Sequence, residues 1–339
     1  MKALVVRDAA IGDLIMATPL FRGLAARGYQ VHAVVKKAPG DAVLPLNPHV
    51  HKLHLLEAQP TMADRTARIT RIADRIEADL VIDLAGTCEN RFLFSASSQE
   101  YNFPLEWRRA NAAGHNYYDY QAQIIGEHAY RGELFVSEAE TQWWTKFRSN
   151  MLGWRIVQLQ LTGSSICKAY PYWPQVIKGL HEQRRQTLVM LTGDPGLGQL
   201  LGLGAVEAGA DPRRIWQTCG DKKMGLRDSL VATAFVDLVI GPETGVLNAA
   251  GCFDTPKVLL LSHSGAEQIS AGWSNCIALH PTAKCAPCYR LVTPGAPCDI
   301  VTEDEDEDIA GAARCMATIS PDAVLGAARL ALQKKGTTS

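Results

Sequence analysis

The sequence predicts an α/β protein of two domains, each with a parallel β-sheet covered by helices on both faces. The chain has 339 residues, which is about twice the length of an average domain. Short β-prone runs alternate with stretches of helical spacing along most of it, and these runs lack the strict alternation of strands that face water on one side. Strands of this kind are buried on both faces, as in α/β folds.

Composition limits the function classes. The chain is 47% hydrophobic and 20% charged, with 34 basic against 35 acidic side chains and a formal charge of −1. This balance provides no strong field for nucleic acid or an anionic membrane, so any anion site must be local. The apolar run at residues 1–6 is too short for a signal peptide. No run approaches the 18 or so apolar residues of a transmembrane segment, and we expect a cytoplasmic protein.

The first half shows one strand, turn and helix unit followed by two further strands. Residues 3–6 form a β-prone run, a glycine turn follows at residues 11–13, and helical spacing begins at Leu14. Residues 31–35 and 79–84 predict further strands. The aromatic stretch at 100–140 lacks this rhythm, and we expect helices that complete the first domain. The predicted domains are residues 1–150 and 151–339, with a linker near 146–153.

The second half repeats the strand and helix rhythm. Strands are predicted at residues 156–161, 187–191, 215–217, 236–240 and 257–261, and helices at 175–180 and 246–251. Residues 193–198 are glycine-rich but contain a proline and lack dinucleotide-binding spacing, so we expect a loop. The acidic run at residues 303–308 predicts a solvated loop.

The strongest motif of the first half spans residues 10–19, where a strand gives way to a helix. Ligands of open α/β sheets bind at this edge. Gly12 would let a substrate approach the backbone, and the Asp13 carboxylate could accept a proton from a substrate hydroxyl. Asp13 is therefore a candidate general base, although an aspartate at this position could equally cap the helix.

A second candidate site follows the strand at 156–161. Thr162, Gly163 and Ser164 come directly after it, and Lys168 lies shortly beyond. Hydroxyl groups, backbone amides and an ammonium group suit a diphosphate. The same residues could also form an ordinary polar loop.

A third candidate site follows the strand at 236–240. Thr244 and Gly245 precede a helical run, and a helix N-terminus favours negative charge. Glu243 would be poorly placed against a phosphate, so we expect it to hold ribose or sugar hydroxyls, or to cap the helix. Two anion sites in one domain indicate a phosphorylated ligand. The chain has no Walker-type lysine loop and no G-x-G-x-x-G after the first strand, which disfavours a nucleoside triphosphate or NAD enzyme.

Several of these motifs together resemble a known family. Ile11-Gly12-Asp13, Ala17-Thr18-Pro19, Lys168 before Trp173-Pro174, and Glu243-Thr244-Gly245 occur in the order seen in glycosyltransferase family nine, the bacterial ADP-heptose:lipopolysaccharide heptosyltransferases. The resemblance covers most of the chain. It implies the GT-B fold, in which two facing Rossmann-like domains hold the active site in the cleft between them.

The resemblance also implies a mechanism and residue roles. Asp13 takes the position of the catalytic base, and Lys168 with Thr162 and Ser164 matches the region that steadies the donor's diphosphate without a required metal ion. Thr244 and Gly245 match a segment whose backbone lies against the donor. The implied reaction is sugar transfer with inversion, using a nucleotide-diphosphate sugar such as ADP-heptose.

Three positions depart from the family pattern. Glu243 replaces an aspartate, and Asn248 replaces a histidine. Arg227 lies where heptosyltransferases often carry a glutamate that holds the nucleoside. These departures leave the donor sugar open. The segments 242–248 and 261–264 resemble a divergent branch of the family that is found in some bacteria and phages. The acceptor also stays open among a glycan, the lipopolysaccharide core, a protein and a modified nucleobase.

The cysteines fall into two groups. Cys88, Cys167, Cys219, Cys252 and Cys276 fit reduced, scattered core positions. Cys285, Cys288, Cys298 and Cys315 crowd together, and four thiolates could form a tetrahedral structural site for zinc or a single iron. Bacterial autotransporter heptosyltransferases, relatives of the same family, carry a comparable metal-holding cysteine finger. Free thiols, or a disulfide, are the alternatives.

Rival functions stay open at this stage. A GT-B sugar-nucleotide epimerase would act on the donor without an acceptor, and a non-catalytic scaffold could keep the fold and the cysteine finger. A nucleic-acid role is disfavoured by the near-neutral charge and the acidic run. The sequence does not indicate an oligomeric state.

Overall fold

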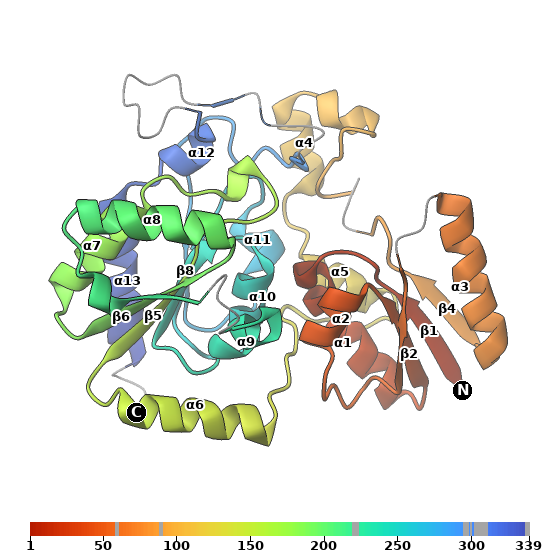
Figure 1. Ribbon diagram of the computed structural model, residues 1–339. Coiled ribbons are helices and arrows are strands. Elements are labelled where there is room, and N and C mark those ends of the chain that lie inside the picture. Colours follow the sequence, from red (N-terminus) through yellow and green to blue (C-terminus); the bar gives the residue numbers. More distant parts are fainter. Residues whose placement is uncertain are drawn as a thin grey trace.

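The fold consists of two lobes, each built on a parallel sheet (Figure 1). The computed structural model describes residues 1–57, 61–87, 91–218, 224–293, 298, 300–301 and 311–335. The acidic run at 303–308, Cys88 and Cys219 lie outside the described residues.

The first sheet has four parallel strands in the order β3-β2-β1-β4. They are β1 (Lys2–Val6), β2 (Gln30–Val35), β3 (Lys52–Leu55) and β4 (Leu80–Asp83). Helices α1 (Ile11–Ala26) and α2 (Lys37–Val43) face the second lobe, and α3 (Met62–Ile76) covers the outer face (Figure 1). In β1, Ala3 and Val5 pack into the core beside α1, whereas Leu4 and Val6 pack with α3. Burial on both faces explains why this strand shows no alternation.

The segment between the sheets is helical, as predicted. It contains η1 (Gln99–Asn102), α4 (Leu105–Ala112), α5 (Tyr117–Gln123) and α6 (Glu138–Asn150). Helix α6 begins with a capping box between Ser137 and Glu140, and its Trp144 stacks on Phe235 of the second lobe. Residues 146–150, which we expected in a linker, therefore form the last turns of this helix.

The second sheet has six parallel strands in the order β10-β9-β8-β5-β6-β7. They are β5 (Arg155–Gln160), β6 (Thr187–Thr192), β7 (Ile215–Gln217), β8 (Leu238–Pro242), β9 (Lys257–Leu260) and β10 (Cys276–Leu279). The helical elements are η2 (Ile166–Lys168), α7 (Trp173–Gln183), α8 (Pro195–Glu207), η3 (Pro212–Arg214), α9 (Leu226–Ala232), α10 (Gly245–Gly251), α11 (Ala266–Ile269), α12 (Arg314–Ala317) and α13 (Pro321–Lys335). The strand order is that of a Rossmann fold, and it reverses direction between β5 and β8. A crevice for ligands is expected at such a switch point.

Every strand predicted from the sequence is confirmed, with ends shifted by one or two residues. Two strands, β3 and β10, were missed because they are short and only partly buried, at the far edges of their sheets. The loop expected at 193–198 is wrong beyond Asp194, because α8 begins at Pro195. Asp194 caps this helix by accepting a hydrogen bond from the Leu197 amide at 2.9 Å, and proline is well suited to the first helical position.

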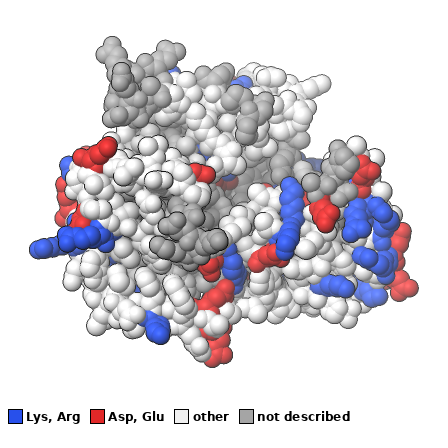
Figure 2. Space-filling model, in the orientation of Figure 1, with Lys and Arg blue, Asp and Glu red and all other residues white. Residues whose placement is uncertain are grey.

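The described residues contain no helix that is both long and apolar enough to cross a bilayer. On the face shown in Figure 2, Lys and Arg side chains are interspersed with Asp and Glu, most densely over α3. This mixture agrees with the near-zero net charge.

The two lobes meet through their helices. Helix α1 packs on α10 and α2 packs on α9, and Leu14 and Leu247 belong to one continuous hydrophobic core. The approach is close at two glycines. A Cβ atom on Gly245 would lie 2.7 Å from Ile11 Cγ2, and one on Gly12 would lie 3.0 Å from Asn248 Nδ2. The glycines of the first and third motifs therefore permit the contact between lobes.

Gly245→Ala should force α10 away from α1. Crowding of this kind costs about 1–3 kcal/mol, so we expect a lower melting temperature and weaker ligand binding in the crevice. Gly326→Ala is the matched control, since no atom lies within 4 Å of its would-be Cβ and alanine favours the helix by about 0.5–1 kcal/mol. Equal melting temperatures for Gly245→Ala and the unmodified protein would contradict the tight contact.

Buried histidines predict acid sensitivity. His32 Nδ1 lies 2.9 Å from His54 Nε2, and burial lowers the pKa of His54 and of His181 to about 4. Between their ordinary value near 6.5 and about 4, the unfolded chain binds more protons than the folded chain, so stability falls as pH falls through this window. Melting temperatures from pH 7.5 to 4.5 test this. His54→Gln should flatten the dependence, and an unchanged slope would be the contrary result.

Candidate functional site

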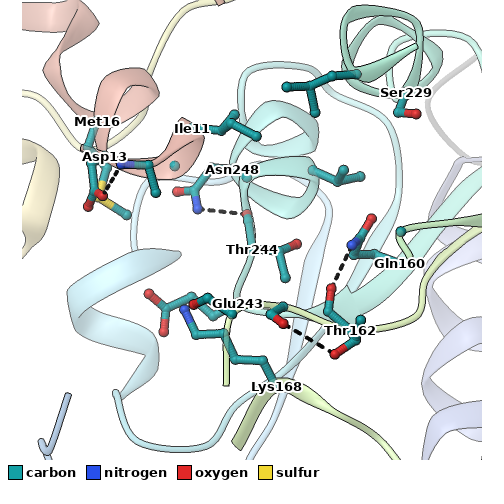
Figure 3. Close-up of a pocket in the computed structure, with 18 of the residues that line it drawn as sticks. Ile11, Asp13, Met16, Gln160, Thr162, Lys168, Ser229, Glu243, Thr244 and Asn248 are labelled. Carbon is teal, nitrogen blue, oxygen red and sulfur yellow. Dashed lines mark hydrogen bonds between the residues drawn. The ribbon is translucent and has the colours of Figure 1, made fainter. Parts of the chain in front are cut away.

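A cavity of about 520 Å³ opens where both sheets present the carboxyl ends of their central strands. The start of α1 forms one wall, and the loops after β5 and β8 form the others (Figure 3). The cavity is lined by ten of the predicted site residues, from both lobes: Gly12, Asp13, Thr162, Gly163, Ser164, Lys168, Glu243, Thr244, Gly245 and Asn248. All three sequence motifs therefore meet in one place.

Asp13 lies in the first turn of α1. Its Oδ1 lies 3.0 Å from Arg7 Nη2, and its Oδ2 accepts a hydrogen bond from the Ala10 amide at 3.0 Å. Asp13 therefore helps to cap α1 from the first turn, although Ala10 is the N-cap residue, and its side chain still faces the cavity with 28% of its surface exposed. A carboxylate that is held in place yet exposed can still meet a substrate hydroxyl.

Lys168 ends η2 and is the only lysine or arginine among the described residues that line the cavity. The loop before it folds back on itself, because the Gly163 amide donates to the Lys168 carbonyl at 3.1 Å. A Cβ atom on Gly163 would lie 2.7 Å from the Lys168 side chain. Glycine at this position leaves room for the ammonium group to cross toward Glu243 (Figure 3).

The segment after β8 begins α10. Thr244, not Glu243, is the N-cap residue, since its hydroxyl accepts from the Leu247 amide. The capping interpretation of Glu243 is therefore wrong, and its carboxylate instead lies 3.4 Å from His263 Nε2. Burial lowers the pKa of His263 to about 4, so its imidazole is neutral at pH 7. His263 therefore does not neutralise the charge of Glu243.

Both polar atoms of the Asn248 side chain make hydrogen bonds within the protein. Its amide nitrogen donates to the Thr244 carbonyl at 2.8 Å, and its amide oxygen accepts from the Tyr118 hydroxyl of α5. The side chain is 2% exposed. It therefore touches the cavity wall while linking α10 to the first lobe.

Arg227 is not brought to the cavity, which corrects the expectation that it takes a nucleoside-binding position. Its guanidinium contacts both carboxylate oxygens of Glu140, at 2.8 and 3.0 Å, and the carbonyls of Ala42 and Phe135. The pair lowers the pKa of Glu140 to about 2. Arg227 is thus a link between α9, α6 and the end of α2.

Sequence reasoning missed several lining residues, namely Gln160, Gly193, Pro195, Met224, Gly225, Leu226 and Ser229. Gly193 and Pro195 lay in the segment assigned to a loop, and the start of a helix after β6 was the signal that could have found them. Gln160 is the last residue of β5, and its side-chain Nε2 donates to the Thr162 carbonyl at 2.7 Å. A polar residue at the end of a buried central strand was the available signal.

The cysteines form a second, smaller cavity of about 190 Å³. Cys285, Cys288, Cys298 and Cys315 all line it, and so does Cys167, which the sequence had placed among the scattered core cysteines. Hydrogen bonds to Cys298 and Cys315 raise the pKa of Cys167. The bond between Cys167 and Cys315 also lowers the pKa of Cys315. Burial raises the pKa of Cys288 to about 11.

The cysteine cavity adjoins the larger one. Cys167 and Lys168 are neighbours in η2, and His263 lines the cysteine cavity while its ring contacts Glu243. Within the described part of the chain, no three His, Cys, Asp or Glu side chains are arranged so as to hold a metal ion. A metal at the four cysteines therefore stays a prediction.

The cysteine segment also joins the lobes. Arg109 of α4 donates to the carbonyls of Lys284 and Ala286 at 2.9 and 2.8 Å, and Arg108 donates to that of Cys288 at 2.8 Å. Phe94 exchanges backbone hydrogen bonds with Tyr289 and Leu291, both at 2.8 Å. The backbone of residues 284–291 is thus held by the first lobe.

The fold has known relatives among solved structures. No protein-family model and no curated protein matches the sequence. The chain is similar to ADP-heptose lipopolysaccharide heptosyltransferase II of E. coli, with a TM-score of 0.65, 14% identity and coverage of 99% of this chain and 100% of that one. A family 9 glycosyl transferase from Veillonella parvula gives a TM-score of 0.68 at 14% identity, over 98% and 97% of the two chains.

A third similar structure is the iron-containing dodecameric glycosyltransferase TibC from enterotoxigenic E. coli. Its TM-score is 0.59 at 12% identity, over 100% of this chain and 80% of TibC. At this level of identity the likeness concerns the fold. The expected architecture is thereby confirmed: the chain has the GT-B fold, and the solved structures that share it include a heptosyltransferase and a family 9 glycosyl transferase.

Proposed function

We propose that the chain is an inverting glycosyltransferase that moves a sugar from a nucleotide-diphosphate donor, ADP-heptose being the leading candidate, to an acceptor hydroxyl. The observation that carries the proposal is the cavity that places Asp13 of one lobe opposite Lys168 and Glu243 of the other (Figure 3). TibC, whose structure is similar to that of this chain, has been solved in complex with ADP-D-beta-D-heptose, which supports this choice of donor.

In the proposed reaction, the acceptor oxygen attacks the anomeric carbon of the donor while Asp13 accepts the hydroxyl proton. The bond from that carbon to the diphosphate oxygen breaks, and its electron pair leaves with the nucleoside diphosphate. Attack opposite the leaving group inverts the anomeric centre. Lys168 would balance the charge that develops on the diphosphate.

Roles for the remaining cavity residues follow from their positions. Gly12, Gly163 and Gly245 leave space for a ligand beside the backbone, and Thr162, Ser164 and Thr244 offer polar groups to the donor. Glu243 would hold sugar or ribose hydroxyls, because a carboxylate repels a phosphate. Arg227 and Asn248 would act indirectly, by holding the lobes that form the cavity. We place this reaction in the cytoplasm, where nucleotide sugars would be available, and divide the chain at residue 150 into acceptor-side and donor-side domains.

Asp13→Ala should lower sugar transfer by about 10²–10⁴-fold, the usual contribution of a general base, while ADP binding measured by calorimetry stays within about twofold. Asp41→Ala is the control, because Asp41 is an exposed aspartate of the same lobe that pairs with Lys37. The assay follows ADP release with a panel of nucleotide sugars and acceptors.

Normal transfer by Asp13→Ala would refute the base assignment. Isomerisation of the donor without an acceptor would identify an epimerase instead. A failure of the unmodified protein to bind any nucleotide sugar in a thermal-shift panel would indicate a non-catalytic scaffold.

We further propose that Cys285, Cys288, Cys298 and Cys315 hold a structural zinc or iron ion. Support comes from the donor set, since these four thiols line one small cavity, with Cys167 as a fifth, and thiolates suit both metals. When bound, the ion would fix the fold of the cysteine segment.

Metal analysis of protein purified without chelators should give about one ion per chain. Cys285→Ser should lose most of it because three thiolates bind more weakly than four. Cys276→Ser is the matched control, as Cys276 does not line the cysteine cavity. A metal content far below one per chain in the unmodified protein would contradict the proposal.

A further inference from the structure

Arg7 is a buried cation directly behind the larger cavity. It follows β1, and its side chain is 1% exposed. A buried charge is costly unless it is paired and hydrogen-bonded. Two groups contact its guanidinium at the carboxyl edge of the first sheet, the Leu84 carbonyl and the Asp13 carboxylate.

The first contact ties Arg7 to the sheet. Its Nη1 donates to the Leu84 carbonyl at 2.7 Å, and the Leu84 amide donates to the Val6 carbonyl at 2.9 Å. Leu84 directly follows β4, so the guanidinium is fastened at the edge between β1 and β4. The strand order of this sheet reverses between these two strands.

The second contact reaches Asp13. Arg7 Nη2 lies 3.0 Å from Asp13 Oδ1, and the Ala10 amide donates to Asp13 Oδ2 at 3.0 Å. Arg7, at the end of β1, therefore holds Oδ1, and the Ala10 amide, at the start of α1, holds Oδ2. Two contacts on different oxygens restrict the rotation of the carboxylate, while the side chain still lines the cavity.

We infer that Arg7 is a positioning residue for Asp13, and this inference rests on the proposed function. A general base must lie within hydrogen-bond reach of the proton that it accepts, and small displacements of a reacting group reduce rate strongly. Arg7 meets this need because it is itself fixed by backbone and burial. It acts through Asp13 and does not belong to the set of residues that line the cavity.

The test is a double-mutant cycle of Arg7→Met and Asp13→Asn, with sugar transfer measured at saturating donor. Arg7→Met should lower kcat by about 10–100-fold with the KM for the donor changed less than twofold, and Arg7→Lys should recover part of the loss. In the Asp13→Asn background, Arg7→Met should cost no further activity, because residues that act as a unit are not additive. Melting temperatures of the same four proteins should show matching non-additivity.

Arg148→Met is the matched control, because Arg148 also makes a two-point ion pair, with Asp237, away from the cavity. Its kcat should stay unchanged even if its melting temperature falls. The inference about Arg7 is overturned if the losses in kcat are additive, or if Arg7→Met is folded and fully active. These outcomes differ from failure of the proposed function, in which the unmodified protein transfers no sugar at all.

Discussion

The close packing of α1 against α10 is the contact on which the site depends. Each helix begins at the carboxyl edge of its own sheet, so their contact places the two switch points on one cavity. Gly12 and Gly245 allow the approach, and Asn248 secures it through Tyr118. The glycines of the sequence motifs therefore serve contact between lobes as well as access for a ligand. An added methyl group at Gly245 would separate the groups that the proposed reaction needs together.

A second contact between the lobes lies at the cysteine segment. Arg108 and Arg109 donate to backbone carbonyls of residues 284–288, and such bonds depend on the path of that backbone. Any ion that orders the four cysteines would order these carbonyls too. Cys167 extends the connection to Lys168 in the neighbouring cavity. The cysteine cavity is thus placed to influence both this contact between the lobes and the proposed donor site.

Local sequence signals predicted the elements and the motifs that stand at strand ends. Asp13, Thr162 and Thr244 each follow a buried parallel strand, and chain-local rules place such residues at one edge of a sheet. What the sequence did not predict are side-chain pairings, two of them between residues distant in the chain. Arg227 pairs with Glu140, Cys167 reaches Cys315, and Arg7 holds Asp13 across the start of α1. Spacing could not reveal these pairings, because they depend on how the lobes and turns pack.

The charges around the larger cavity bear on what it can bind. Among the described lining residues, Asp13 and Glu243 are acidic and Lys168 is the only lysine or arginine, a poor balance for a diphosphate. Arg7 changes this balance, because its buried guanidinium offsets the charge of Asp13 from behind the wall. Lys168 lies beside Glu243 (Figure 3). With the charge of Asp13 offset, Lys168 and the polar groups of Thr162 and Ser164 are the groups left to bind an anion. Removing Arg7 would release the proposed base from the position in which the sheet and the start of α1 hold it.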